Sequence, residues 1–581
     1  MLAGEFWVNG HRGAKGGYNK NRMSRLNLKQ TATAAHVYGK RQAEAEAFTE
    51  QQKDATHWTL GPSDLKPYAN DAFCEGVNRL LLHSATCQPP SDGKPGYEYC
   101  AGTHFTPNVT WWNQSKEFFN YLNRCQYMLQ KGLFVADVCF YLGERPPLLA
   151  PPKYNVPGLG TGYDCDYANP DVLLNRMTVK DGRIILPDGM NYRMLVLQDC
   201  PSPVKDIADE VGRYQGLQVS SVPSRTMSVA VIKKIRSLIE AGATVVGAPP
   251  ENAGGLASYA QADVEVKNIA HELWGDLDGK NKKEKKIGKG RLIWGTTPRE
   301  LLLQDRVVPD FEYEGLNNDA DDFDYIHRRA EKTDIYFVIN RTNKQQNREF
   351  SFRVGDRVPE IWDAVTGRKY DATNYTVKNG ITTMELNFDV FGSYFIVFNK
   401  PLGPNATGKG KSNFLTFTGL QELNGNWKVA FDTKWGGPAS TDFPELISWT
   451  DRPEEGVKSY SGTATYSKTF NLQKPVNGKP IYLELTDVKN VAEIKLNGKP
   501  LGVLWCAPWR VNISNAVKAS GNVLEISVTN LWCNRVVHDL SLPVSSRITK
   551  THESFRFDML NVNTPMLPSG LLGKVKIVMS N

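Results

Sequence analysis

The chain has 581 residues, of which 40% are hydrophobic and 10% aromatic, and it carries a formal net charge of +7 at pH 7. This composition excludes a largely disordered protein, and the length predicts several domains because single hydrophobic cores stop growing at about 250–300 residues. The sequence contains no apolar run of about 18 residues or more, so we expect no membrane span.

The first 86 residues alternate between strand patterns and helix patterns. Short apolar strands are predicted at residues 2–8, 42–48 and 79–86, and helices at residues 22–40 and 65–79. Strands that alternate with helices in this way are typical of consecutive βα units built on a parallel sheet.

Polar side chains occur at similar places in these three predicted strands. Glu5, Glu46 and His83 are 41 and 37 residues apart, and each lies toward the carboxyl end of its strand. In parallel barrels such positions carry the catalytic groups, so we predict a site here. Glu44 lies on the same face as Glu46, one step deeper, and for Glu44 we favour a structural role such as an ion pair.

Only about three βα units are visible, whereas a closed (β/α)8 barrel takes about 250 residues. Because an open parallel sheet with bare edges invites aggregation, we expect residues 1–133 to be the C-terminal part of a (β/α)8 barrel. We prefer a fragment of a longer protein to a chain that completes its barrel with a partner. The first residues also lack the basic and apolar regions of a signal peptide.

The pattern of residues 134–315 predicts an α/β domain. Its clearest element is a helix with apolar residues from Val231 to Ile239, which Gly242 suits as a cap and an apolar strand follows. This segment carries no glycine-rich nucleotide-binding motif after a strand.

The remainder of the chain predicts all-β structure. Short strands divided by turn residues indicate a small β-sandwich at residues 316–400. A second β domain is predicted at residues 401–581, which includes a linker at residues 401–412 at its start. A hairpin turn is expected at Asn497–Lys499. Six of the thirteen tryptophans lie in this last domain, and we expect most of them to be core residues. The fold class is therefore multidomain, α/β followed by all-β.

The basic residues are unevenly distributed. Residues 280–291 contain seven basic residues and one acidic residue, which leaves the rest of the chain close to neutral. The run has no aromatic residue on which a base could stack, so we interpret it as a solvated loop and expect no nucleic-acid partner. The nine cysteines show no metal-binding spacing. The sequence leaves open whether one or two disulfides form, and it does not indicate which cysteines would pair.

Four segments resemble glycoside hydrolase family 106, the α-L-rhamnosidases. They are GEFW at residues 4–7, AHVYGKRQAEAEAFT at residues 35–49, GTHFTPNVTWWNQSKEFFNYLNRCQYMLQKG at residues 102–132 and PSGLLGKVKI at residues 568–577. The resemblance covers essentially the whole chain and identifies it as the C-terminal portion of such an enzyme. It also makes the last domain similar to galactose-binding-like jelly rolls.

The resemblance implies an inverting, calcium-dependent glycosidase that removes terminal α-linked L-rhamnose from plant glycans such as pectin. Glu46 would be the general base and Glu5 a catalytic-site carboxylate that contacts the sugar or its calcium ion, while His83 would bind the sugar. The general acid would then lie upstream of Met1, and a chain that lacks it would be an inactive fragment. The full-length protein would be periplasmic or secreted, and its partner an oligosaccharide or polysaccharide.

Trp111 and Trp112 follow the last predicted strand of the first domain, where an indole can provide a platform for a sugar ring. Adjacent residues in regular structure do not face the same ligand, so we expect at least one of the two to be packed in the core.

Two other functions remain open at this point. The β domains alone could make a non-catalytic carbohydrate-binding protein, and the accessory domains would also suit a β-galactosidase-like glycosidase. A second carboxylate partner for Glu46 would favour an enzyme over the carbohydrate-binding protein. A panel of aryl glycosides would distinguish a rhamnosidase from the β-galactosidase-like glycosidase.

Overall fold

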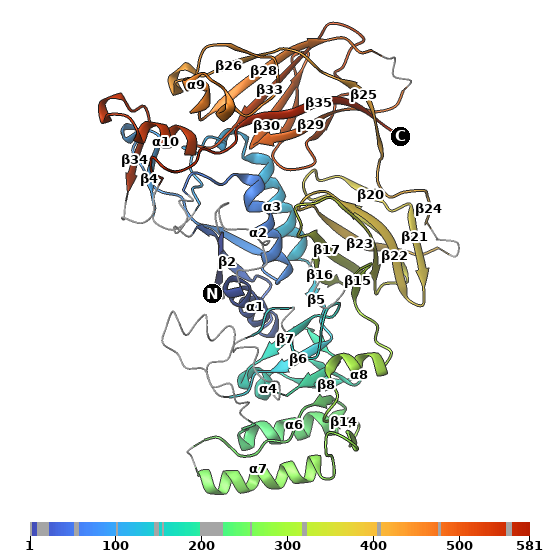
Figure 1. Ribbon diagram of the computed structural model, residues 1–581. Helices are drawn as coiled ribbons and strands as arrows, with labels where there is room; N and C mark the ends of the chain where they lie inside the picture. Colours follow the sequence, from blue (N-terminus) through green and yellow to red (C-terminus); the bar gives the residue numbers. More distant parts are fainter. Residues whose placement is uncertain are drawn as a thin grey trace.

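The computed structural model describes residues 3–8, 22–50, 57–99, 103–144, 150–153, 156–197, 225–255, 258–315, 322–403, 408–473, 478–553 and 560–581. The N-terminal segment lies in the middle of the molecule, with a parallel sheet and its helices below it and two all-β parts beside and above it (Figure 1). The fold therefore combines α/β and all-β parts, as the sequence predicts. Among the described residues, no helix has the length and apolar character needed to cross a bilayer.

The N-terminal strands form a three-stranded parallel sheet in the order β1-β2-β3. Its elements are β1 (Ala3–Val8), α1 (Arg22–Val37), β2 (Glu44–Glu50), α2 (Pro62–Cys74) and β3 (Arg79–Leu82). Both predicted helices and all three strands are confirmed. Helix α1 approaches β1 closely because Gly4 has no side chain, and a Cβ at Gly4 would lie 2.6 Å from the Thr31 hydroxyl.

The segment after β3 connects the N-terminal sheet to the two β parts of the molecule. It contains β4 (Pro95–Glu98), α3 (Lys116–Leu129) and β5 (Leu133–Phe134). Strand β4 pairs in parallel with β34 (Lys550–Glu553), and β5 pairs with β16 (Phe323–Ala330). Helix α3 buries Phe118 and Tyr121, whose rings contact Trp505.

A six-stranded sheet follows, in the order β13-β14-β12-β11-β6-β7, parallel except for β13. Its strands are β6 (Val138–Tyr141), β7 (Cys165–Ala168), β11 (Met194–Val196), β12 (Thr244–Val246), β13 (Glu284–Ile287) and β14 (Gly290–Ile293). The helices around it are α4 (Pro170–Asn175), α6 (Val229–Ala241), α7 (Tyr259–Trp274) and α8 (Pro298–Gln304). A small sheet of β8 (Thr178–Lys180), β9 (Arg183–Ile185) and β10 (Asn191–Tyr192) adjoins it.

Two predictions meet different outcomes here. The predicted helix is α6, and Gly242 caps it with a φ of +127°. The basic run at residues 280–291 was predicted as a solvated loop, which is wrong, because most of it forms the β13–β14 hairpin. Its lysines suit an edge strand, where charge discourages pairing with another chain.

The next part is a sandwich of two antiparallel sheets around an aromatic core that includes Tyr336, Phe350 and Phe352. One sheet has the order β15-β18-β22-β21-β24 and the other β20-β19-β23-β17-β16-β5. Its strands not yet given are β15 (Phe311–Tyr313), β17 (Thr333–Asn340), β18 (Gln346–Phe352), β19 (Arg357–Trp362), β20 (Lys369–Asp371), β21 (Asn374–Lys378), β22 (Ile381–Phe388), β23 (Ser393–Pro401) and β24 (Gly408–Lys409).

The C-terminal part pairs a four-stranded sheet, β25-β35-β29-β32, with a six-stranded sheet, β27-β26-β28-β33-β30-β31. Its strands are β25 (Phe417–Glu422), β26 (Trp427–Phe431), β27 (Thr441–Phe443), β28 (Thr463–Phe470), β29 (Ile481–Lys489), β30 (Val491–Leu496), β31 (Lys499–Leu504), β32 (Arg510–Asn512), β33 (Asn522–Thr529) and β35 (Gly570–Ser580), with helices α9 (Glu455–Lys458) and α10 (Cys533–Leu540). The predicted hairpin joins β30 to β31 through Asn497 and Gly498, both with positive φ. Four of the six tryptophans are buried, as predicted: Trp427, Trp449, Trp505 and Trp532.

Buried charges join the N-terminal helices to the parts around them. Asp164 lies 3.0 Å from the Lys29 ammonium on α1 and 2.9 Å from that of Lys153, and these side chains are 2–3% exposed. Arg341, which follows β17, pairs with Asp71 on α2 and with Asp324 on β16. Burial alone would lower the pKa of Lys29, but Asp164 raises it above its usual value.

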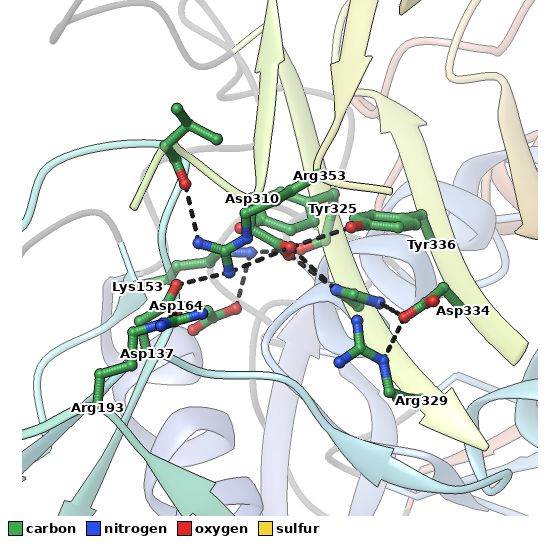
Figure 2. Close-up of polar contacts among 12 residues, drawn as sticks. Asp137, Lys153, Asp164, Arg193, Asp310, Tyr325, Arg329, Asp334, Tyr336 and Arg353 are labelled. Atoms are coloured by element: carbon green, nitrogen blue, oxygen red, sulfur yellow. Dashed lines mark hydrogen bonds and ion pairs between the residues drawn. The ribbon is translucent and has the colours of Figure 1, made fainter. Parts of the chain in front are cut away.

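A second set of charges links the parallel sheet to the sandwich (Figure 2). Arg353 contacts Asp137 at 2.8 Å and Asp310 at 3.4 Å, and His327 lies between Asp310 and Asp334. Burial would raise the pKa of Asp310, but His327 and Arg353 hold it well below the usual range. Burial alone would lower the pKa of His327, but the carboxylates of Asp310 and Asp334 raise it above its usual value.

Candidate active site

Glu5 and Glu46 lie next to each other on the N-terminal sheet. In the parallel register of β1 and β2, Glu5 is the direct partner of Glu46, and Glu46 in turn pairs with Leu81 on β3. Partners in a parallel pair point to the same face, and neighbouring strands are about 4.8 Å apart. Both carboxylates are partly exposed, so the sheet brings together two acids that the sequence places 41 residues apart.

An irregularity in β2 determines where this pair lies. The register shifts between Glu5, opposite Glu46, and Trp7, opposite Thr49, and Phe48 has a φ of +68° at the shift. The β2–β3 ladder ends at Ala47, one residue after Glu46. Glu46 is therefore close to the carboxyl end of the regular sheet, although β2 itself continues to Glu50.

Glu46 has two polar neighbours among the described residues. The Thr49 hydroxyl donates a 2.8 Å hydrogen bond to Oε1 of Glu46, and Nε2 of His83 lies 4.0 Å from the same oxygen. The Glu46 side chain is 41% exposed and that of His83 24%, so both are accessible. Nδ1 of His83 and the hydroxyl of Ser84 are buried without a hydrogen-bond partner among the described residues, which is unusual for polar groups.

Glu44 has the structural role that the sequence favours. Its side chain is 9% exposed, and its Oε1 lies 3.0 Å from the Arg79 guanidinium at the start of β3. This ion pair holds β2 against β3 and takes no part in the accessible face around Glu46.

The two adjacent tryptophans have different environments. Trp111 is 1% exposed, and its ring contacts those of Phe105 and Phe118 in the core. Trp112 is half-buried beside Phe119 and lines a cavity that also reaches the C-terminal part of the chain. The expectation that at least one of the pair packs in the core is therefore met by Trp111, and Trp112 is the indole within reach of a ligand.

A buried histidine pair near the site was missed by the sequence analysis. Nδ1 of His57 lies 3.2 Å from Nε2 of His104, and Trp58 stacks on the His104 ring at 3.9 Å. Burial lowers the pKa of His57 to about 4 and that of His104 well below its usual value, so both rings are neutral near pH 7. Thr103, next to His104, donates its backbone N–H to the carbonyl oxygen of Phe48. His104 could have been identified from the sequence, because it lies within the segment at residues 102–132 quoted above. Its partner His57 could not, because no spacing in the sequence connects the two histidines.

Glu5 and Glu46 are the carboxylates of the site that could contribute to a calcium ion. Calcium takes six to eight oxygen ligands, and the parts of the chain that the structure describes contain no cluster of three or more His, Cys, Asp or Glu side chains. Glu5 and Glu46 supply two neighbouring carboxylates and no more. No disulfide joins any two of the seven cysteines that the structure describes.

Comparison with known proteins gives two family matches. The family described as alpha-L-rhamnosidase, glycoside hydrolase family 106, matches residues 1–211 and 205–377, and a galactose-binding domain-like family of glycosyl hydrolase family 2 matches residues 450–554. The chain is similar to a rhamnosidase from Novosphingobium sp., with 28% identity and a TM-score of 0.84, over 100% of this chain and 51% of that protein. It is also 24% identical to a putative beta-glucuronidase from Formosa agariphila, over 94% of this chain and 64% of the relative. The chain thus spans about half to two thirds of the length of these relatives.

Proposed function

The chain belongs to glycoside hydrolase family 106, the α-L-rhamnosidases, and from this we propose that it is part of an enzyme that hydrolyses terminal α-linked L-rhamnose from plant glycans of the pectic type. The likeness to a solved rhamnosidase over the whole of this chain supports the proposal. Because the substrate would be a polymer outside the cell, we also propose that the intact protein is periplasmic or secreted. The three parallel strands with α1 and α2 support the further proposal that they are part of a (β/α)8 barrel.

In this proposal Glu46 is the general base of an inverting hydrolysis. An inverting enzyme holds a water between an ionised carboxylate and the anomeric carbon, and this carboxylate removes a proton from the water as the new bond forms. Glu46 suits the role because it is accessible and hydrogen-bonded through Oε1 to Thr49, which fixes its orientation and leaves Oε2 for the water.

Glu5 then positions the sugar and does not protonate the leaving group. The acid and base of an inverting enzyme are about 6.5–9.5 Å apart, whereas Glu5 is the direct neighbour of Glu46 on strands about 4.8 Å apart. A carboxylate this close is better placed to accept hydrogen bonds from the sugar hydroxyls or to bind a calcium ion that also binds them. His83 lies on the other side of Glu46 and can donate to the same sugar.

Calcium remains part of the proposal on the basis of family membership and of the oxygen chemistry of Glu5. When bound, the ion would hold the sugar hydroxyls in place, and no proton-transfer step depends on it. Trp112 would contact the glycan substrate through its half-buried indole, while Trp111 packs in the core beside Phe105 and Phe118.

The adjacent pair Glu5–Glu46, with His83 at 4.0 Å, carries the proposal. Replacing Glu46 with Gln in the intact protein should lower kcat on an aryl α-L-rhamnoside by about 10²–10⁴-fold, since the amide cannot accept the proton. Glu44→Gln is the matched control on the same strand and should keep kcat within about threefold, because Glu44 does not reach the accessible face. Near-normal turnover of Glu46→Gln would refute the assignment of the base.

A further inference from the structure

A cavity of about 170 Å³ lies between the segment that precedes α3 and the C-terminal part of the chain. The indoles of Trp112, Trp435 and Trp532 form part of its lining. Trp112 is more than 300 residues away from the other two in the sequence, so the cavity exists only in the assembled fold. In Figure 1 the N-terminal strand β4 lies beside α10 and β34, at the same end of the molecule as the β26 sheet.

The aromatic side of the cavity is fixed in place. Trp532 is 3% exposed, and its Nε1 donates a 2.6 Å hydrogen bond to the backbone oxygen of Asn108. The Thr110 hydroxyl donates to the backbone oxygen of Asn530, which adds a second contact between the same two segments. Trp435 packs edge-on against Trp532, with ring centroids 4.7 Å apart, and remains half-buried. A ligand would therefore meet a preformed apolar wall.

The polar side of the cavity carries groups of both signs. Lys94, Asn113 and Asp432 line it and are exposed. The backbone N–H of Asp432 donates to the Tyr460 hydroxyl, which donates in turn to the backbone oxygen of Thr463. The loop that carries the Asp432 carboxylate is thus anchored through Tyr460 to the first residue of β28. A carboxylate, an amide and an ammonium group beside half-buried indoles match a ligand with several hydroxyls and one apolar face.

The same segment of chain connects this cavity with Glu46 and His83. Thr103 donates its backbone N–H to the oxygen of Phe48, and Phe105 donates to that of Ser84, the residues next to the candidate site. Nine residues after Thr103, the segment reaches Trp112 at the cavity. One continuous segment of chain therefore contacts the residues beside the candidate site and also lines the cavity.

We propose that this cavity binds a neutral pyranose ring of the glycan, at a distance from the bond that is cleaved. A pyranose ring has one face of C–H groups, which packs on an indole, and a rim of hydroxyls, which the Asp432 and Asn113 side chains can bind. A volume of about 170 Å³ is many times the roughly 10–15 Å³ that a cavity needs to hold one water, so the cavity has room for a sugar ring. The mixed charges of Lys94 and Asp432 favour a neutral sugar over a uronic acid. The inference rests on the proposed function only in taking a glycan as the ligand.

Isothermal titration calorimetry with the intact protein tests this inference. The probe is a neutral tetrasaccharide that ends in α-linked L-rhamnose, measured in the Glu46→Gln background so that no turnover contributes to the signal. Adding Trp435→Ala should raise the dissociation constant at least tenfold, and adding Asn113→Ala about threefold. The matched control is Trp362→Ala, which removes a half-buried indole of β19 outside the cavity and should leave the constant unchanged.

The outcomes separate this inference from the proposed function. If Trp435→Ala and Asn113→Ala both bind as tightly as the background protein, or if only an acidic oligosaccharide binds, the inference is wrong. If binding weakens as expected although the protein with Glu46 intact cleaves no rhamnoside, the cavity is a sugar site and the catalytic proposal fails alone. Asn113 is exposed, so its variant tests the site even if Trp435→Ala unfolds.

Discussion

The buried ion pairs of Asp164 predict a large effect from a change of one atom. Asp164→Asn keeps the shape of the side chain but removes its charge, next to two ammonium groups at 3.0 and 2.9 Å. Lys153 retains Asp324 at 3.6 Å, whereas the ion pair described for Lys29 is with Asp164. The substitution therefore leaves a cation on α1 that is 2% exposed and has lost the carboxylate in contact with it.

The size of the effect follows from this burial. Removing one partner of a buried ion pair typically costs about 3–5 kcal/mol, because the other charge stays out of water without compensation. The asparagine oxygen still accepts a hydrogen bond from Lys29, so we expect about 3 kcal/mol of lost unfolding free energy for the part of the fold that contains α1. A loss of this size is a large fraction of the stability of a typical domain, about 5–15 kcal/mol.

Hydrogen exchange is a suitable assay, since a chain with several cores need not unfold in one step. Amides of α1 should exchange about 100-fold faster in Asp164→Asn, which corresponds to about 3 kcal/mol at 1.4 kcal/mol per factor of ten. Asp305→Asn is the control, because it breaks a surface pair with Arg291 that should contribute at most about 1 kcal/mol. Equal exchange of α1 in the two variants would refute the reasoning.

Three further predictions concern calcium, pH and backbone packing. Chelation should abolish rhamnoside cleavage by the intact protein and added calcium should restore it, whereas activity that is indifferent to chelator removes calcium from the proposal. The pKa of His57 falls from 6.5 to about 4 on folding, so between these two pH values the unfolded chain binds more protons than the folded one. The free energy of unfolding should therefore drop by up to about 3 kcal/mol as the pH is lowered from 6.5 to 4. Urea titrations of His57→Asn should show a smaller drop over the same pH range. Gly132→Ala would place a Cβ 2.1 Å from the backbone oxygen of Arg329 at a φ of +59°, and should lower the melting temperature by several degrees; an unchanged value would contradict the close packing of β5 on β16.

The elements themselves could be predicted from local patterns. The apolar spacing of α6 and its cap at Gly242, the turn at Asn497–Gly498, and the alternation of strands and helices before residue 86 depend on neighbours within a few residues. Such signals act through backbone propensity and the burial of one face, which a short window of sequence contains. The basic run at residues 280–291 misled the prediction, because charge indicates exposure and an edge strand is exposed as well.

The candidate site could be predicted only in part. Glu5, Glu46 and His83 were identified as a group by their recurring place in successive strands, and the structure brings them together. The bulge at Phe48, which places Glu46 near the end of the regular ladder, depends on how β1 and β2 align and has no local signal. The His57–His104 pair was missed for the same reason.

By itself the sequence determined that the chain combines α/β and all-β parts, where its main helices and turns lie, and which acids could serve catalysis. Only the tertiary structure decided which of these groups meet. Lys29 pairs with Asp164 and Trp532 bonds to Asn108 across 135 and 424 positions of the chain. The physical reason is that buried charges and indoles take whichever partner packing brings within about 3 Å, and that choice is made by the docking of whole sheets and helices, which no short stretch of sequence records.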